Sequence, residues 1–363
     1  MNQRINTGII GATGMVGQMF INLLENHPWF NVTYLAASES SAGKSYEEAV
    51  RGRWHISSEV PGYVRNLMVE DASKVEKAMG KCSLIFCAVS LGKEEVKAME
   101  SLYASKGFAV VSANSAFRLA PDVPMLIPEI NHEHINIIPT QQKNNGWTKG
   151  FIAVKPNCSI QSYMIPLHAL IVKGYKIKQM VLTTLQGLSG AGYPGPSAYD
   201  LVDNIIPLIK GEEEKSEIEP QKILGAIKDG KIEYDTSIQF SAHCTRVPVI
   251  DGHTVCASIS FEGKKPSEKE ILDCWKNYHS VPVELGLPSA PEQTIIYRNE
   301  PDRPQPRKDR DSGKGMAVTV GRLRTCNVFD YRFVGLSHNT IRGAAGGAIL
   351  MAELLAAKGF INK

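Results

Sequence analysis

One cysteine differs from the other six in the chain by its surroundings. Cys158 lies in the segment Lys155–Ser159 (KPNCS), a turn-like stretch that precedes an apolar, helical run. A thiol at the start of a helix meets the positive end of the helix dipole and free N–H groups, which lower its pKa and make it a nucleophile. Asn157 would add a hydrogen-bond donor for an oxyanion. The alternative is a buried, unreactive thiol, which suits the other cysteines in their strand-like or amphipathic runs.

A proton-transfer group and an anion-binding group follow in the segment RVPVIDGHT, residues 246–254. His253 comes after a glycine on an expected turn, which would expose its ring for acid–base chemistry. Arg246 lies one strand length earlier and could hold a carboxylate through two parallel hydrogen bonds. Each residue taken alone is more often structural. Together with a nucleophilic thiol and a cofactor site they predict catalysis.

Two further segments supply polar groups to such a site. A glycine-rich turn begins at Gln186 (QGLSGAG) and follows an expected strand, which suits contacts with a substrate or a nicotinamide. Glu219 and Lys222 lie one helical turn apart and could complement an ammonium and a phosphate or carboxylate. From spacing alone, a solvated helix face explains this pair better.

A dinucleotide site is predicted near the N-terminus. Residues 11–17 (GATGMVG) follow an apolar strand and open a helix, so the glycines permit a tight turn and place a pyrophosphate at a helix N-terminus. An acidic residue at the end of the second strand would bind the ribose of NAD. Residues 37–44 instead read ASESSAGK, whose hydroxyls and lysine favour the 2′-phosphate of NADP, although Glu39 opposes a phosphate. NADP is the expected cofactor, and NAD stays open.

These residues need two domains to position them. Residues 1–150 alternate apolar strands with helices, which predicts a Rossmann-type, doubly wound parallel sheet. Residues 151–337 hold longer alternating runs, which predict an α+β catalytic and dimerisation domain with a mainly antiparallel sheet. The helix at 338–363 is rich in small residues and should pack back onto the first domain. The charged, proline-rich stretch 299–315 is typical of a mobile loop.

Composition excludes several classes of protein. Forty Lys and Arg against 37 Asp and Glu give a net charge of +3, too balanced to predict binding to nucleic acid or a membrane surface. No segment approaches the roughly 18 apolar residues of a membrane helix. The N-terminus is typical of a strand and loop, not of a signal peptide. Seven cysteines, an odd number without a CxxC pair, suggest reduced thiols in the cytoplasm and no metal site.

The motifs, taken together, resemble aspartate-semialdehyde dehydrogenases of the branch found in archaea, fungi and some bacteria. The resemblance runs nearly end to end, and the pairing of PNCS with RVPVIDGHT is its most specific part. Further matching motifs are GATGMVG, SAGK, ANSAFR, LQGLSGAGYPG, GMAVTVGR and SHNTIRGAAGG. Relatives in this branch often carry Arg where this chain has Ser40, so a strict preference for NADP does not follow.

The resemblance implies a role for each site residue. Cys158 would be the nucleophile, His253 the acid/base, and Gln186 would position the thioester. Arg246 would hold the substrate α-carboxylate, Glu219 the α-amino group, and Arg118, Asn114 and Lys222 the phosphate. Cofactor contacts would come from Gly11, Thr13, Gly14, Met15 and Val16 at the pyrophosphate, Ser38 and Ser41 at the 2′-phosphate, and Ser189, Gly190 and Asn339 at the nicotinamide.

The implied activity is a reversible, NADPH-dependent reduction of 4-phospho-L-aspartate to L-aspartate 4-semialdehyde and phosphate through a cysteine thioester. It would serve the biosynthesis of lysine, methionine and threonine, in a homodimer or homotetramer. Alternatives are a malonyl-CoA reductase of the same fold, an N-acetyl-glutamyl-phosphate reductase, and a non-catalytic dinucleotide-binding redox sensor. Cys158 and His253 argue against the sensor, and Glu219 favours an amino-acid substrate over malonyl-CoA.

Overall fold

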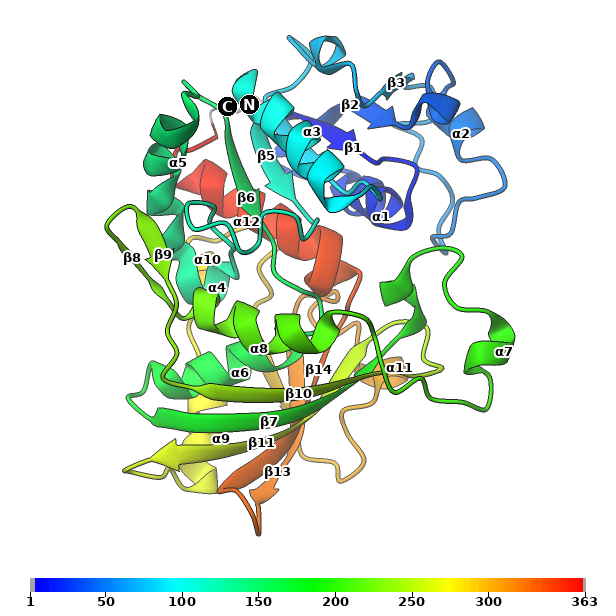
Figure 1. Cartoon of the computed structure of the whole chain (residues 1–363). Coiled ribbons are helices and arrows are strands. Elements are labelled where there is room, and N and C mark those ends of the chain that lie inside the picture. Colours follow the sequence, from blue (N-terminus) through cyan, green and yellow to red (C-terminus); the bar gives the residue numbers. More distant parts are fainter. Residues whose placement is uncertain (1–3, 362–363) are drawn as a thin grey trace.

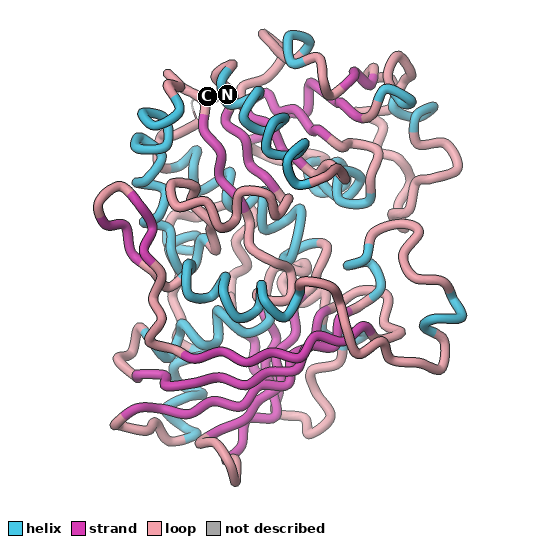
Figure 2. Tube along the Cα trace, viewed as in Figure 1, coloured by secondary structure: helices cyan, strands magenta, loops and turns pink. Residues whose placement is uncertain are grey.

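The computed structural model describes residues 4–361, and its strands form two large sheets, one above the other in Figures 1 and 2. The expected first domain (1–150) and last helix (338–363) include residues 1–3 and 362–363, which lie outside the described residues. No helix in the described part of the chain is long and apolar enough to cross a membrane.

The first sheet is parallel throughout, in the order β3-β2-β1-β4-β5-β6. The order changes direction between β1 and β4, the point at which ligands bind in doubly wound sheets. The expected Rossmann-type fold is therefore confirmed. The strands are β1 (Ile5–Ile10), β2 (Phe30–Ala37), β3 (Val69–Asp71), β4 (Leu84–Cys87), β5 (Ala109–Ser112) and β6 (Phe151–Val154).

The parallel sheet extends past the domain boundary expected at residue 150. Strand β6 pairs with β5 along its whole length, so residues 151–154 belong to the first sheet and the expected boundary lies too early. The strand has only four residues, FIAV, and leads directly into the Cys158 segment. A short apolar run without its own turn signal cannot be assigned to one sheet or the other from its pattern.

Helices cover both faces of the parallel sheet. α1 (Met15–Leu24) and α12 (Gly346–Ala357) share a buried apolar cluster with one face, and α3 (Lys93–Ser105) packs on the other. The C-terminal helix thus packs onto the first domain, as expected from its small residues. A single π-helical turn, Ile341–Ala345, precedes α12. Such turns are rare and occur often at functional sites.

The second sheet is mixed, in the order β10-β7-β11-β14-β13-β12, with three antiparallel and two parallel pairings among the described residues. α6 (Gln161–Ile171) and α9 (Glu268–Lys276) pack on one face, and α6 is apolar on nearly all sides because it also contacts the first domain. The strands are β7 (Lys176–Gln186), β10 (Gln239–Arg246), β11 (His253–Glu262), β12 (Ile295–Arg298), β13 (Val318–Thr325) and β14 (Tyr331–Ser337).

Helix α8 (Glu212–Ile223) lies along the edge strand β10. The side chains of Glu217 and Glu213 accept hydrogen bonds from the backbone N–H groups of Ala242 and Cys244, at 3.0 and 3.1 Å. An edge strand otherwise offers unpaired N–H groups to other chains. These bonds fix α8, and with it Glu219, against the sheet that carries Arg246.

Short elements complete the fold. The stretch 299–315, expected to be a mobile loop, contains a helical turn and surrounds the buried carboxylate of Asp309, which accepts hydrogen bonds from Arg298 and Arg303. The remaining elements are α2 (Tyr46–Ala49), α4 (Pro128–Asn131), α5 (Ile138–Asn145), α7 (Ala198–Leu201), β8 (Ala226–Lys228), β9 (Lys231–Glu233), α10 (Val281–Glu284) and α11 (Pro306–Asp309).

Candidate active site

The glycine-rich turn joins β1 to α1 at the carboxyl end of the parallel sheet. Gly11 has a φ of +82°, and a Cβ there would lie 2.4 Å from the carbonyl oxygen of Ala88. A Cβ on Gly17 would lie 2.1 Å from the carbonyl oxygen of Gly11. A Cβ on Gly14, by contrast, would make only an ordinary van der Waals contact, 3.5 Å from the carbonyl oxygen of Gly11. Gly11 and Gly17 therefore permit the tight turn, whereas the surrounding protein does not itself require a glycine at position 14.

The start of α1 supplies the polar backbone that a pyrophosphate needs. Met15 and Val16 form the first turn of the helix, where N–H groups without a partner in the helix are available to an anion. The carbonyl of Thr13 accepts a hydrogen bond from the Gln18 side chain at 3.0 Å, which fixes the turn. The pyrophosphate contacts of Thr13, Gly14, Met15 and Val16 stay a prediction, and this geometry is compatible with it.

The segment after β2 lies beside that turn. The N–H groups of Gly11 and Ala12 both donate to the carbonyl of Ala36, at 2.8 and 3.1 Å. Ser38 is exposed and its hydroxyl lies 3.0 Å from that of Ser40, whereas Ser41 is buried. The two serines expected at the 2′-phosphate thus differ, and only Ser38 exposes a substantial part of its surface.

Three neighbouring strands bring the catalytic candidates into one row. In the register of the mixed sheet, Gln186 at the end of β7 stands opposite Arg246 at the end of β10 and His253 at the start of β11. All three side chains are buried. Because strand register fixes their spacing, the three residues need no rearrangement to act together.

Cys158 lies beside this row, and its Sγ is 3.2 Å from Nε2 of His253. Cys158 precedes α6 by three residues and packs on the π-helical turn. A Cβ on Gly343 of that turn would lie 2.8 Å from the Cβ of Cys158. Burial raises the pKa of the Cys158 thiol, and Glu212 adds to this, while Lys155, Arg118 and Arg246 oppose it. The expectation of a lowered pKa is wrong, because desolvation outweighs the helix dipole and the nearby cations.

His253 is fully buried and not exposed on a turn, as had been expected, because it begins a central strand. Its Nδ1 accepts a hydrogen bond from the Gly187 N–H at 3.1 Å, so the proton of the neutral ring lies on Nε2, facing Sγ of Cys158. Burial and the charge of Arg246 lower the pKa of His253 to about 3. The ring is therefore a neutral hydrogen-bond donor in this arrangement.

Glu212 is a member of the site that the sequence did not reveal. It accepts hydrogen bonds from Asn157 Nδ2 at 2.9 Å and from Gln186 Nε2 at 3.3 Å. Burial acts to raise its pKa, but Lys215 and these amides hold the pKa below its usual range. Asn157 therefore donates to a carboxylate and not to an oxyanion, contrary to expectation. In the sequence, Glu212 is one of three consecutive glutamates that resemble an exposed helix start.

Arg118 and Glu219 form a buried ion pair. Nη1 of Arg118 lies 3.0 Å from Oε1 of Glu219, whose Oε2 accepts from the Asn157 N–H at 2.6 Å. Arg118 Nε also donates to the carbonyl of Lys155, at 2.9 Å. Glu219 is 2% exposed, so the solvated helix face suggested by spacing is wrong. The pair ties α8 to the Cys158 segment.

Lys222 points toward backbone carbonyls of the Arg118 loop. Its ammonium is fully buried and donates to the carbonyls of Arg118, Ala120 and Val123, at 2.7, 2.6 and 2.9 Å. Burial lowers the pKa of Lys222 to about 7, yet three carbonyl acceptors require three N–H donors and so the charged form. The phosphate contact expected of Lys222 stays a prediction, and this placement does not support it, because the helix turns the side chain toward the backbone of the Arg118 loop.

Two other polar residues border Cys158 and the phosphate candidates. Asn114 donates to the carbonyl of Val89 at 2.7 Å, which holds it in the loop after β5. Lys155 is almost fully buried, and burial, with Arg118, lowers its pKa to about 7. Lys155 was visible in the KPNCS motif, but nothing in its type or spacing distinguished it from a surface lysine.

The residues expected near the nicotinamide lie together. Asn339 donates to the Ser189 hydroxyl at 2.7 Å and accepts from the Gly252 N–H at 2.7 Å. A Cβ on Gly190 would lie 2.9 Å from Nη1 of Arg246 and 3.0 Å from Cε1 of His253. Glycine at position 190 therefore keeps this side of the imidazole and guanidinium clear. Their contact with a nicotinamide stays a prediction.

A glycine-rich turn on a doubly wound sheet, combined with a cysteine–histidine pair on the adjoining sheet, is the layout of a nicotinamide-dependent dehydrogenase that reacts through a thiol. Two family models agree with it: "Semialdehyde dehydrogenase, NAD binding domain" matches residues 6–138, and "Semialdehyde dehydrogenase, dimerisation domain" matches residues 167–342.

Individual relatives narrow the class. The aspartate-semialdehyde dehydrogenase of Archaeoglobus fulgidus is 44% identical and that of Candida albicans 42%, over at least 97% of this chain and 98% of each relative. The crystal structure of the Candida albicans enzyme with NADP has a TM-score of 0.89 at 40% identity, covering 99% of this chain and 100% of that chain. A Vibrio cholerae aspartate-semialdehyde dehydrogenase II has a TM-score of 0.74 at 25% identity, covering 98% and 99%. The chain belongs to the aspartate-semialdehyde dehydrogenase family.

Proposed function

We propose that the protein catalyses the reversible, phosphate-dependent oxidation of L-aspartate 4-semialdehyde, and in biosynthesis the reduction of 4-phospho-L-aspartate, with NADP(H). The observation that carries this proposal is Cys158 Sγ at 3.2 Å from His253 Nε2, beside the aligned Gln186 and Arg246. The names of the relatives that align over nearly the whole chain support the choice of substrate. The reaction belongs to the synthesis of lysine, methionine and threonine.

The thiolate of Cys158 attacks the aldehyde carbon, forming a C–S bond and an oxyanion. The thiol proton leaves to solvent beforehand, and Nε2–H of His253 together with Lys155 stabilises the negative sulfur. The same Nε2–H then donates to the oxyanion. When bound, the nicotinamide accepts the hydride that leaves the carbon. Cys158 then carries the acyl group as a thioester. Base catalysis by His253 would require the ring tautomer with its proton on Nδ1, whereas the hydrogen bond from the Gly187 N–H to Nδ1 leaves the proton on Nε2.

A phosphate oxygen next attacks the thioester carbon, the C–S bond breaks, and the Cys158 thiolate leaves. The acyl phosphate keeps the energy of the oxidation, so the step runs in both directions. Burial raises the pKa of the thiol and by itself makes the thiolate a poorer leaving group, so this step depends on Nε2–H of His253 and on the charge of Lys155, which stabilise the negative sulfur.

The substrate's own charges have partners in the site. Arg246 already donates to the carbonyl of Gly187 at 2.6 Å and keeps further N–H donors for an α-carboxylate. Glu219 supplies a carboxylate for the α-amino group, and it must share or exchange its bond to Arg118 when substrate binds.

We place the phosphate subsite at Arg118 without Lys222. Arg118 lines a pocket between the start of α3 and α8, together with Lys93, Ser115 and Lys215 and the carboxylates of Glu214 and Glu219. Arg118 and Lys215 are paired with Glu219 and Glu212, so a dianion would bind here by taking over part of those ion pairs with the help of Lys93 and the Ser115 hydroxyl. Asn114, next to Ser115, borders the same loop.

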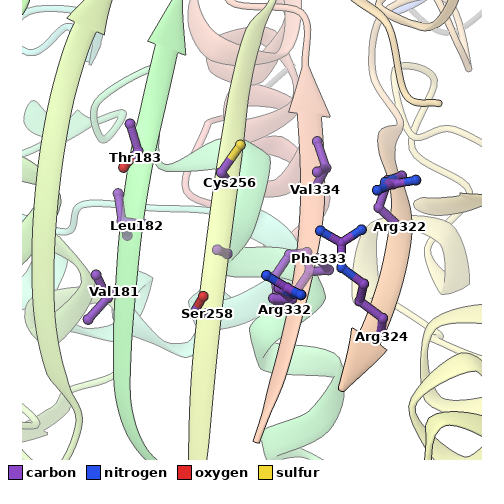
Figure 3. A pocket seen from close by; sticks show the side chains of 11 residues that line it. Val181, Leu182, Thr183, Cys256, Ser258, Arg322, Arg324, Arg332, Phe333 and Val334 are labelled. Carbon is purple, nitrogen blue, oxygen red and sulfur yellow. The ribbon is translucent and has the colours of Figure 1, made fainter. Parts of the chain in front are cut away.

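The cofactor and assembly follow from the same family relationship. NADP is supported by the glycine turn, by the absence of an acidic residue directly after β2, and by the NADP in the crystal structure of the Candida albicans enzyme. We infer a homo-oligomer assembled through the mixed sheet, whose face opposite α6 carries Cys256, Arg324 and Arg332 (Figure 3). Free cysteines among the described residues suit the reducing cytoplasm.

The test is an assay of NADPH formation from L-aspartate 4-semialdehyde, NADP and phosphate. Omitting phosphate should remove steady turnover, and Cys158→Ala should show none. Malonyl-CoA with NADPH is the comparison substrate. Activity with malonyl-CoA alone would contradict the proposed substrate while leaving the fold and nucleophile in place.

A further inference from the structure

We propose that Arg53 binds the 2′-phosphate of NADP(H) and sets the preference for NADP over NAD, in place of a cation at position 40. This inference rests on the proposed function, because it concerns the cofactor of that reaction. It arises from the way the chain after β2 folds back onto the glycine-rich turn.

Arg53 lies at the point where the adenosine ribose sits in this fold. In a doubly wound sheet the ribose binds at the end of the second strand, beside the glycine turn. The glycine turn is hydrogen-bonded to Ala36, near the end of β2. The Arg53 guanidinium lies close to the same end of β2, where its Nη2 donates to Ser41 Oγ at 2.8 Å.

Three contacts hold the loop of Arg53 against the cofactor turn. Gln18 Nε2 donates to the carbonyls of both Thr13 and Arg53, at 3.0 and 2.8 Å. The hydroxyl of Tyr46 donates to the carbonyl of Ala12 at 2.9 Å. The ring of His55 stacks on Tyr193 with centroids 4.0 Å apart, which joins the loop to the second domain. The position of Arg53 is therefore fixed by the fold.

The charge of Arg53 is available to a ligand. Its Nε is oriented by the carbonyl of Ala49 at 2.8 Å, and the residue remains exposed. The ion pairs found among residues 4–361 involve neither Arg53 nor Lys44, whose ammonium donates to the carbonyl of Ser40 at 2.8 Å. At longer range, Lys44 adds to the hydrogen bonds of Ser45 in lowering the pKa of the Glu48 carboxyl. A 2′-phosphate can accept from these two cations and from the Ser38 and Ser40 hydroxyls, and their charge must outweigh that of the exposed Glu39.

The same geometry explains how the chain tolerates Ser40. A hydroxyl at position 40 cannot compensate the charge of a phosphate, whereas a guanidinium arriving from residue 53 can do so with parallel hydrogen bonds. Arg51, two residues earlier, is also exposed, yet its charge acts on Glu48, and none of its side-chain bonds reaches Ser41. It is the matched control for a change of charge in this loop.

The experiment measures dissociation constants of NADPH and NADH by quenching of protein fluorescence, for the intact protein, Arg53→Gln and Arg51→Gln. Loss of a charge-assisted bond predicts NADPH binding weaker by about 10- to 100-fold in Arg53→Gln. NADH binding should change by less than about twofold, and it also reports that the variant is folded. Arg51→Gln should bind both cofactors as the intact protein does.

A rescue variant separates a direct contact from a structural one. Adding Ser40→Arg to Arg53→Gln should restore NADPH binding to within about tenfold of the intact protein, because the new guanidinium reaches the same phosphate. Equal weakening of NADPH and NADH in Arg53→Gln, or no change in either, would overturn the role of Arg53. An intact protein that binds NADH as tightly as NADPH would overturn it as well. An intact protein that binds neither nucleotide would overturn the proposed function itself.

Discussion

The two sides of the active site hold their polar groups in different ways. On the strand side, Gln186, Arg246 and His253 are fixed by register, and the backbone of Gly187 orients both the guanidinium and the imidazole. On the helix and loop side, Arg118 and Glu219 neutralise each other. The difference teaches that the strand side, including Arg246 with its free donors for a carboxylate, is ready before substrate arrives, whereas Arg118 and Glu219 must exchange partners when substrate binds.

The largest effect should come from the strand side. His253→Ala should lower kcat by about 10²–10⁴-fold with a small change in KM, because the imidazole acts on the oxyanion. His253→Gln keeps an N–H donor but no base, so it should retain at least about tenfold more activity than His253→Ala. Steady-state kinetics decide this, and equal losses in the two variants would show that His253 acts by removing a proton.

The helix side should respond in stability. Arg118→Ala leaves Glu219 buried without its cation, which should cost about 3–5 kcal/mol in the free energy of unfolding. Replacing both residues by leucine should cost less than the sum of the single changes. Urea unfolding measures both. Lys269→Ala, which breaks the exposed pair with Asp273, is the control and should leave the midpoint unchanged. Additive losses would contradict direct pairing of Arg118 with Glu219.

Lys222 tests whether every cation on the helix side binds substrate. Lys222→Met removes the donor of three carbonyls and should lower the free energy of unfolding by about 1–3 kcal/mol. The KM for phosphate should stay within about twofold of the intact protein. Lys228→Met on the exposed β8–β9 hairpin is the matched control and should change neither quantity. A tenfold rise in the KM for phosphate with unchanged stability would show that Lys222 binds the phosphate.

The pH dependence should follow the Cys158 thiol and the neighbouring Lys155, whose pKa burial lowers to about 7, and not His253. Burial raises the pKa of Cys158 and lowers that of His253 to about 3, so kcat/KM for aldehyde oxidation should still rise with pH where an ordinary thiol is already ionised. Since the unfolded state binds the His253 proton more tightly, its contribution to stability is complete above about pH 6.5 and is lost as pH falls toward 3. An additional inflection in kcat/KM between about pH 5 and 7 that disappears in His253→Gln would contradict the neutral ring.

The smallest effect should come from the turn that follows β7. Ser189→Ala removes the acceptor of the Asn339 amide and should raise the KM for NADP by about 2- to 10-fold, with kcat nearly unchanged. Initial-rate measurements at saturating aldehyde and phosphate test this. A loss of kcat larger than that of KM would assign Ser189 to the chemistry and not to cofactor binding.

The sequence predicted the residue types of the strand side well and their surroundings less well. The glycine turn and the PNCS and RVPVIDGHT motifs carry local signals, because turn glycines and strand ends are encoded by near neighbours. The burial of His253, the raised pKa of Cys158 and the carboxylate of Glu212 depend on contacts between residues tens of positions apart. No local pattern encodes those contacts.

The fold shows the same division. Alternation of strands and helices predicted the doubly wound sheet, but the four-residue β6 was placed in the wrong domain because a short apolar run has no periodicity of its own. The sequence also did not predict the direction in which the Lys222 side chain points or the ion cluster around Asp309. Both are set by packing of α8 and of the 299–315 stretch against distant loops.

The central claim, that Cys158 carries the acyl group as a thioester, has a direct test. Mixing the protein with L-aspartate 4-semialdehyde and NADP without phosphate should give a burst of about one NADPH per active site and no further turnover. Mass spectrometry of the quenched protein should find the acyl group on the peptide that contains Cys158, and Cys158→Ser should give neither burst nor adduct. Steady NADPH production without phosphate, or an adduct at another cysteine, would contradict the account.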